Sequence, residues 1–261
     1  MSVIAILCLL AIVLSITVFM VWASASIRSR VYVRAFCREK TDRKVVYLTF
    51  DDGPHPPETE RVLDVLRERG ARATFFLIGS KVSGNEAVLR RMLEEGHTLG
   101  LHTYSHAGTF PLLSLDKMLA DVNEGKRTVE SVAGRKISLF RPPFGVTNPT
   151  IAKVVRTLGL QTVGWDVRSF DTMFCKSSEH SCNSSGYSCN SSGHDWYVSV
   201  VERIMKQVRP GSVILLHDRL DGASGLLALL LDSLAASGYD FTCVLPNTLI
   251  SSSDSSKTNL S

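Results

Sequence analysis

The sequence predicts an α/β protein: a distorted (β/α) barrel of about seven parallel strands, preceded by one N-terminal transmembrane helix. From residue 44 to residue 245, short apolar segments typical of strands alternate with amphipathic segments typical of helices. This alternation implies parallel strands joined by right-handed crossovers. Seven such strands suit a barrel better than an open sheet, although periodicity alone does not choose between the two. Before this region, residues 3–23 carry no charge.

The expected strands are short and apolar, and the expected helices lie between them. The strands cover residues 44–50, 73–78, 97–102, 137–141, 160–166, 212–217 and 240–244. The helices cover residues 57–69, 85–95, 114–132, 148–158, 196–208 and 223–236. In the first helix, apolar residues between Val62 and Leu66 lie opposite charged ones, and Gly70 ends the helix.

Length and composition fit one globular α/β domain. The 261 residues are 44% hydrophobic and 21% charged, and the formal charge of +4 is spread along the chain. Because nucleic-acid-binding proteins carry dense basic patches, the sequence indicates no nucleic-acid partner.

The charge-free run of residues 3–23 is long enough for a transmembrane helix, which needs about 20 apolar residues. Trp22 at its end suits the membrane interface. A cleaved signal peptide is the alternative, because Ala23-Ser24-Ala25 resembles a small-residue cleavage site. The run is long for a signal peptide and no Lys or Arg precedes it, so we expect residues 1–25 to be a membrane anchor or uncleaved signal. A basic linker at 26–43 would follow.

The basic residues around this helix bear on its orientation. None precedes it, and five follow it: Arg28, Arg30, Arg34, Arg38 and Lys40. The positive-inside rule would then keep the main domain in the cytoplasm. The six cysteines do not settle the compartment, because they lack the regular spacing of a disulfide framework.

Residues 172–195 form an insertion rich in Cys, Ser and Asn. In it, Ser181-Cys-Asn-Ser-Ser-Gly-Tyr187 is followed by the similar Ser188-Cys-Asn-Ser-Ser-Gly-His194. A second metal site could be read from its polar residues Cys175, Cys182, Cys189, His180 and His194. Their spacing matches no zinc pattern, so we interpret the insertion as a duplicated flexible loop. In an oxidising space Cys182 and Cys189 could pair as a disulfide. The serine-rich tail at 248–261 has too little apolar surface to fold.

Two adjacent carboxylates, Asp51 and Asp52, end the first strand in the segment Thr49-Phe50-Asp51-Asp52-Gly53-Pro54. The carboxyl ends of parallel strands are where α/β folds place their active sites. The Gly-Pro turn stops the strand and lets both side chains lean into one cleft. Because adjacent carboxylates repel, a positive partner is expected, and a metal ion is the commonest. A plain turn is the alternative.

Two histidines, His102 and His106, follow the third strand. At i and i+4 they would share one side of a helical turn, close enough to hold one metal together. With Asp52 they make one carboxylate and two imidazoles, the set of a three-ligand catalytic zinc site with room left for water. His55 and His97 lack such partners and are expected to be structural.

Polar residues recur at three further strand ends. Arg141-Pro142-Pro143-Phe144-Gly145 follows the fourth strand, and its prolines stiffen the loop while leaving the N–H groups of Phe144 and Gly145 free. Trp165 and Asp171 flank the segment after the fifth strand, and Leu215-Leu216-His217-Asp218 ends the sixth. Packing alone explains such a recurrence poorly.

In order, these segments resemble the motifs of the polysaccharide deacetylase family (the NodB-homology domain, carbohydrate esterase family four). The resemblance rests on Thr-Phe-Asp-Asp-Gly-Pro, His-Thr-x-x-His, Arg-Pro-Pro-Phe-Gly and Leu-Leu-His-Asp, and spans roughly residues 44 to 245. It places a NodB-like domain at 44–247 and implies a distorted (β/α) barrel that removes acetyl groups from sugars with the help of a metal.

The resemblance also implies a role for each motif residue. Asp52, His102 and His106 would bind a divalent metal, most often zinc, with cobalt or nickel as alternatives. Asp51 would be the general base that deprotonates the metal-bound water. Arg141 would lie beside Asp51 and keep it ionised, the expected effect of a nearby cation.

On the other side of the site, His217 would be the general acid that protonates the leaving group, and Asp171 would hold it protonated. The Phe144 N–H, together with the metal, would stabilise the tetrahedral oxyanion. Trp165 would contribute to substrate binding, and Leu215 would line a small pocket for the acetyl methyl group.

Three departures from the family pattern, at Thr172, Arg168 and Leu101, bear on the substrate and touch neither metal nor acid and base. We therefore predict that the protein is a deacetylase of an N-acetylated glycan, peptidoglycan-like or chitin-like, and that it is anchored by a single membrane pass. Because such polymers lie outside the membrane, the resemblance favours an extracytoplasmic domain, against the charge rule. Alternatives are a deacylase of a lipid-linked amino sugar or an O-acetylated polysaccharide, and an inactive glycan-binding module.

Overall fold

The structure, a computed structural model, describes residues 2–174 and 194–246. Its helices are α1 (Val3–Ala25), α2 (Glu58–Glu68), α3 (Glu86–Glu94), α4 (Leu115–Ala133), α5 (Pro149–Thr157), α6 (Asp171–Phe174), α7 (His194–Gln207) and α8 (Ala223–Ala236), with 3₁₀ turns η1 (Gly79–Lys81), η2 (Phe110–Leu112) and η3 (Pro143–Gly145). Its strands are β1 (Val45–Asp51), β2 (Thr74–Leu77), β3 (Thr98–Leu101), β4 (Leu139–Phe140), β5 (Gln161–Thr162), β6 (Val167–Arg168), β7 (Val213–His217) and β8 (Asp240–Thr242).

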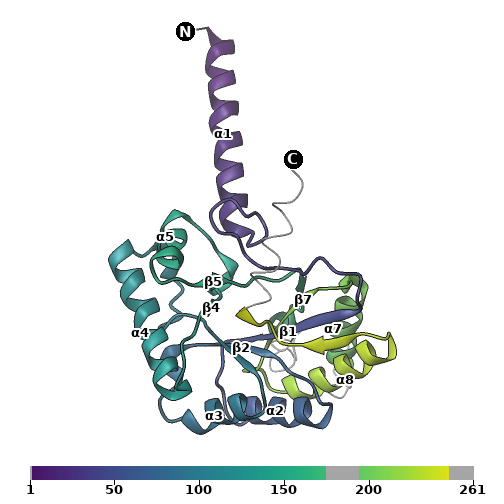
Figure 1. Cartoon of the computed structure of the whole chain (residues 1–261). Coiled ribbons are helices and arrows are strands. Elements are labelled where there is room, and N and C mark those ends of the chain that lie inside the picture. Colours follow the sequence, from purple (N-terminus) through teal and green to yellow (C-terminus); the bar gives the residue numbers. More distant parts are fainter. Residues whose placement is uncertain (1, 175–193, 247–261) are drawn as a thin grey trace, which may run out of the picture.

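The strands form one curved parallel sheet in the order β5-β4-β3-β2-β1-β7-β6, with β8 pairing beside the start of β1. Among the described strands, β5 and β6 end this order, so the sheet is a half-barrel. Helices α4, α3, α2, α8 and α7 surround it, and α1 rises from the side that they leave open (Figure 1). The predicted α/β barrel-like fold is confirmed. The strand expected at 160–166 is shorter, covering only β5 (Gln161–Thr162), and the short strand β6 (Val167–Arg168), which was not expected, follows it.

Strand alternation divides the core into two layers. In β1, Val46, Leu48 and Phe50 face outward and pack in the large cluster between sheet and helices. Residues at odd positions face the inside of the half-barrel: Tyr47 packs in the inner cluster, and Asp51 stands above it at the strand's end. Alternation along β1 therefore places the carboxylate of Asp51 at the inner edge of the half-barrel.

Helix α1 is, among the described residues, the one helix long and apolar enough to cross a membrane, a test that a signal sequence near the N-terminus also passes. The segment expected to be a basic linker, 26–43, does not stand free of the domain. Phe36 forms an isolated parallel bridge with Val163 after β5, and Arg38 an antiparallel one with Ser212 before β7. The segment thus runs between the two sides of the half-barrel's opening.

Several sequence-based expectations lie outside the described residues. These are the second metal site, the Cys182–Cys189 disulfide, most of the insertion at 172–195 and the tail at 248–261. Of the described cysteines, Cys37 and Cys243 are buried free thiols and Cys8 is exposed on α1.

Candidate active site

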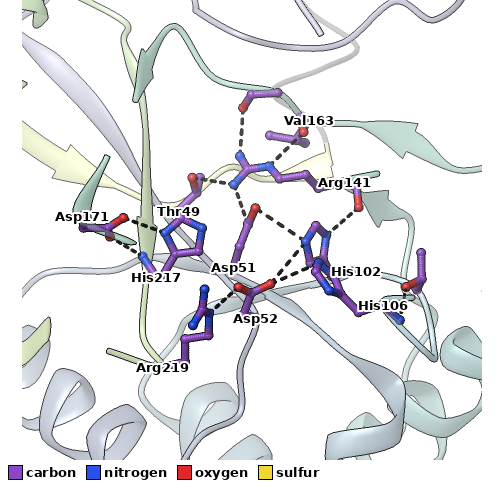
Figure 2. A network of polar contacts seen from close by, with 12 residues as sticks. Thr49, Asp51, Asp52, His102, His106, Arg141, Val163, Asp171, His217 and Arg219 are labelled. Atoms are coloured by element: carbon purple, nitrogen blue, oxygen red, sulfur yellow. Dashed lines mark hydrogen bonds and ion pairs between the residues drawn. The ribbon is translucent and has the colours of Figure 1, made fainter. Parts of the chain in front are cut away.

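The predicted site residues converge at the carboxyl ends of the strands. Figure 2 shows Asp51 and Asp52 at the end of β1, facing His102 and His106 on one side and His217 on the other. In the parallel register, Asp51 lies directly beside His217 of β7. Residues far apart in the chain are therefore brought together because parallel strands end at the same edge.

One side of the site is the triad Asp52, His102 and His106. His106 Nε2 lies 3.3 Å and His102 Nε2 3.6 Å from Asp52 Oδ1, and one ligand atom from each residue lies within 4.8 Å of the others. His102 Nδ1 lies 2.7 Å from the carbonyl oxygen of Arg141. A proton on Nδ1 would donate to that carbonyl and leave Nε2 as the lone-pair nitrogen, the usual arrangement of a metal-binding histidine. This donor set and spacing fit a divalent metal such as zinc.

The two histidines do not share a helical turn, so that expectation is wrong. Residues 102–106 form an irregular turn in which Thr103 (φ 66°) and His106 (φ 49°) take left-handed backbone conformations. The carboxylate of Asp121 holds the turn by accepting hydrogen bonds from the N–H groups of Tyr104 and Ser105, at 3.0 and 3.2 Å. The imidazoles converge all the same, with ring centroids 4.8 Å apart.

Asp51 meets a fully buried arginine. Arg141 Nη1 donates to Asp51 Oδ1 at 2.7 Å and to Thr49 Oγ1 at 2.9 Å. Its remaining nitrogens donate to the carbonyls of Val163 (3.1 Å) and Gly164 (2.8 Å). The guanidinium is thus held on three sides, and burial lowers its pKa against the opposing effect of Asp51. Its position beside Asp51 is the one predicted.

His217 and Asp171 form a second pair of a basic side chain and a carboxylate. Asp171 Oδ1 lies 2.8 Å from His217 Nδ1, and Oδ2 accepts the backbone N–H of His217 at 2.9 Å. Burial alone would lower the pKa of His217, but Asp171, with smaller contributions from Asp51 and Asp52, outweighs it and raises the pKa. The charged imidazolium is therefore favoured at this position.

Burial alone would raise the pKa of Asp52. Its neighbours His102, His217 and His106 and the guanidinium of Arg219 outweigh that effect and hold the pKa at about 2. His106 shifts the other way, because burial and the nearby His102 lower its pKa. An ionised carboxylate beside a neutral imidazole is the protonation state that metal ligation requires.

Two cations at this site were not predicted from the sequence. Arg219, two residues after His217, donates through Nε to Asp52 Oδ2 at 2.7 Å. Lys81 donates through Nζ to the backbone oxygen of Asp52 at 2.8 Å. Both line a cavity of about 280 Å³ whose other walls are Asp52, Ile78, Ser80, Ser105 and His106. In the sequence, the one sign of such a cation is the position of Arg219 two residues after the strand-end motif that contains His217.

The three predicted substrate residues, Phe144, Leu215 and Trp165, do not line this cavity. Phe144 is 54% exposed and its ring lies 5.3 Å from that of His106. Leu215 is buried on the same face of β7 as His217. Trp165 packs over Gly145, where a Cβ would collide with the ring. The Gly145 N–H, expected to be free, donates to Pro142 O at 3.1 Å, so of the two amides in this loop only that of Phe144 stays a candidate oxyanion donor.

The remaining polar residues of the motifs are structural in their contacts. His97 is buried below the site and accepts the Ala73 N–H through Nδ1. Asp218 is buried, accepts from Thr59 Oγ1 at 2.8 Å and has a pKa raised by burial to about 7. His55 is exposed.

Comparison with known proteins matches residues 38–163 to the family model described as polysaccharide deacetylase. A peptidoglycan-N-acetylglucosamine deacetylase of Bacillus cereus is 34% identical over 211 residues, which cover 78% of this chain and 87% of the relative. The chain belongs to the polysaccharide deacetylase family. A chitooligosaccharide deacetylase of Azorhizobium caulinodans is 31% identical over 178 residues, covering 66% of this chain and 73% of the relative.

Solved structures show the same fold. The peptidoglycan deacetylase PdaC from Bacillus subtilis has a TM-score of 0.66 at 28% identity, covering 83% of this chain and 94% of that one. A carbohydrate esterase family four pseudoenzyme from Bacillus anthracis has a TM-score of 0.68 at 21% identity, covering 83% and 69%. Because polysaccharide deacetylase folds include a pseudoenzyme, activity has to be argued from this chain's own site.

Proposed function

We propose that this protein is a metal-dependent hydrolase that removes acetyl groups from an N-acetylated glycan, peptidoglycan-like or chitin-like. The observation that carries the proposal is that a candidate base and a candidate acid lie close together at the same edge of the sheet. Asp51, fixed by Arg141, and His217, fixed by Asp171, lie side by side at the ends of β1 and β7, next to the Asp52 carboxylate. The named relatives act on peptidoglycan and chitooligosaccharides, which supports this substrate class.

Asp52, His102 and His106 would hold the metal, most simply zinc, with cobalt or nickel as alternatives. When bound there, a divalent cation supplies Lewis-acid polarisation and makes a nucleophile available near neutral pH. Asp51 acts as general base and takes the proton of the attacking water. The hydrogen bond from Arg141 keeps the second carboxylate oxygen of Asp51 directed at the site, since the guanidinium cannot move without losing its other three bonds.

His217 acts as general acid and gives its proton to the leaving amine. Its raised pKa favours the charged imidazole, and the 2.8 Å contact with Asp171 fixes Nδ1 so that Nε2 is the nitrogen presented to the substrate. An acid and a base held in different surroundings can both be in their active states near neutrality.

The three predicted substrate residues bind the substrate in this proposal. The Phe144 N–H donates to the developing oxyanion, Leu215 contacts the acetyl methyl group, and Trp165 forms a wall of the opening. The domain of residues 44–247 works at the membrane, anchored by α1, and faces the extracytoplasmic side, where the relatives' cell-wall substrates lie.

The test is acetate release from a panel of acetylated glycans, followed by mass spectrometry, with zinc, cobalt or nickel added. We expect chelation to abolish release and His217→Ala to lower it by about 10²–10⁴-fold. His55→Ala is the matched control, because that histidine is exposed and its hydrogen bonds are made by the backbone: its N–H donates to Thr59 Oγ1 and its carbonyl accepts the Thr59 N–H. Undiminished release after chelation would refute the proposal. Saccharide binding without turnover would identify a binding module instead.

A further inference from the structure

The segment between α1 and β1 completes the catalytic domain. We call residues 26–39 the connector. Phe36 donates its N–H to Thr162 O and accepts the Gly164 N–H, both at 2.9 Å, which adds the connector to the β5 edge. Three residues on, the Glu39 N–H donates to Gly211 O at 2.9 Å, just before β7. The connector therefore runs from the β5 edge of the sheet to the segment just before β7, across the open side of the half-barrel.

The connector's side chains are core residues as well. Phe36 belongs to the inner cluster of the half-barrel and packs edge-on against Tyr47, with ring centroids 5.6 Å apart. Ile27, Ala35 and Cys37 form a second buried cluster against Trp165. A flexible tether would show neither feature, so the connector is rigid where it meets the site.

The end of α1 is fixed to the active-site loop. Ser24 O accepts the N–H of Thr147 at 2.9 Å, and Ala23 is fully buried. Thr147 lies three residues after Phe144. Trp165, against which the connector packs, lies over Gly145 and 5.5 Å from the Arg141 guanidinium. The apolar helix is thus joined to the catalytic rim by ordered, packed chain.

The length of α1 then fixes the height of this rim above a bilayer. Its 23 residues span about 34 Å, close to the hydrocarbon thickness of about 30 Å, so Ser24 lies at the level of the lipid headgroups. Interface residues gather at the same level. Tyr32 reaches back along the helix, with its hydroxyl 3.3 Å from Met20 Sδ. The exposed side chains around it are Trp22, Val31 and the arginines Arg28, Arg30 and Arg34.

Aromatic and basic side chains are those that contact interfaces and anionic headgroups. Leu112, 86% exposed, lies next to Pro111, whose carbonyl accepts from Asn148 beside Thr147. An exposed leucine there is accounted for if the bilayer that α1 enters covers this face. Thr147 follows Arg141 by six positions in the chain, a reach of at most about 20 Å.

We propose that the connector holds the catalytic rim at headgroup height, so that the substrate is an acetylated amino-sugar glycan attached to a membrane lipid. This inference rests on the proposed deacetylase function and on a retained α1. For a soluble glycan, a catalytic rim held at headgroup height offers no advantage. A glycan displayed by a lipid is presented at that height.

The experiment uses the full chain with zinc in vesicles of phosphatidylcholine and phosphatidylglycerol. One substrate is chitotetraose coupled to phosphatidylethanolamine in the same vesicles, and the other is free chitotetraose. A flexible Gly-Ser insertion of about 20 residues, with a root-mean-square length of about 25 Å, is placed between Ala25 and Ser26. The same insertion between Gly134 and Arg135, after α4, is the matched control.

We expect the insertion after Ala25 to lower turnover of the lipid-linked sugar about tenfold and to leave that of the free sugar within about twofold. The control insertion should change neither. Equal turnover of the lipid-linked sugar by wild type and the Ala25 insertion would overturn the inference and leave the deacetylase function standing. Lack of turnover of both sugars by the wild type would refute the deacetylase function itself.

A second measurement does not depend on activity. Hydrogen exchange of the full chain in vesicles should show slow exchange for the amides of Phe36, Gly164 and Thr147, as for core strands. Exchange as fast as that of an exposed loop would overturn the rigid connector.

Discussion

Two adjacent aspartates each pair with an arginine, and the two pairs differ in almost every other respect. Arg141 is fully buried and makes four hydrogen bonds, one of them to Asp51. Arg219 is 40% exposed and reaches Asp52 through Nε alone. Two neighbouring aspartates therefore differ in their partners. Asp51 is held by a rigid, buried arginine, and Asp52 is contacted by a partly exposed one.

The difference follows the work that each carboxylate would do. A base has to stay in one orientation, and a buried pair with further hydrogen bonds cannot reorient without leaving a charge unpaired. A metal ligand has to exchange partners. An ion pair whose arginine is 40% exposed is screened by solvent and is expected to contribute only about 1 kcal/mol or less, so it breaks easily. We infer that the fold fixes Asp51 and leaves Asp52 adjustable.

Asp51→Asn gives the sharpest break between the two pairs. The amide cannot take a proton from water, so turnover should fall by about 10²–10⁴-fold. Zinc affinity, measured by competition with a chromophoric chelator, should stay within about tenfold of wild type, since this substitution leaves the triad intact. Asp64→Asn, at an exposed carboxylate paired with Arg67 and Arg91 on the helical surface, is the control and should behave as wild type. Retained turnover in Asp51→Asn would remove Asp51 as the base.

Arg141→Gln should mainly affect stability. It leaves Asp51 buried without its cation and two buried carbonyls without donors, so the free energy of unfolding in urea should fall by about 3–5 kcal/mol. In Arg219→Gln the same measurement should change by less than about 1 kcal/mol. Equal losses in the two variants would show that the pairs are energetically alike and would contradict the comparison.

The sequence predicted well whatever depends on local pattern. Asp51 and His217 were placed on one rim because parallel strands end at a shared edge, and each strand's end is marked locally by its polar residues. The family, the α/β fold and a candidate triad could all be inferred in this way.

Contacts between segments that are distant in the chain could not be predicted from the sequence. Arg219 meets Asp52 across 167 residues of chain because β7 pairs directly with β1, and the sequence alone does not show which strands are neighbours. The packing of Phe36 inside the half-barrel could not be predicted, because five basic residues nearby indicate only a basic linker. The turn at His102 was taken for a helix because left-handed residues such as Thr103 carry no glycine to mark them.

Asp171→Asn should move the pH dependence without removing the acid. Asp171 raises the pKa of His217, so the imidazole is protonated up to a higher pH than usual. In the Asp171→Asn variant that pKa falls, and loss of one opposite charge is typically worth about 1–3 pH units. The alkaline limb of the kcat/KM profile should therefore shift to lower pH, measured by acetate release across pH. An unmoved limb would mean that another group sets it.

Arg219→Gln should have the smallest effect, on metal binding at low pH. Arg219 helps hold the pKa of Asp52 at about 2, after the larger effects of burial and the histidines. Without it Asp52 takes up a proton at higher pH, so zinc should be released earlier on acidification, with affinity at neutral pH changed by less than about tenfold. Arg168→Gln is the matched control, because its guanidinium lies over the ring of Phe170. Loss of zinc affinity at neutral pH by more than about a hundredfold would mean that Asp52 depends on its exposed arginine as strictly as Asp51 depends on its buried one, and the contrast between the two pairs would fail.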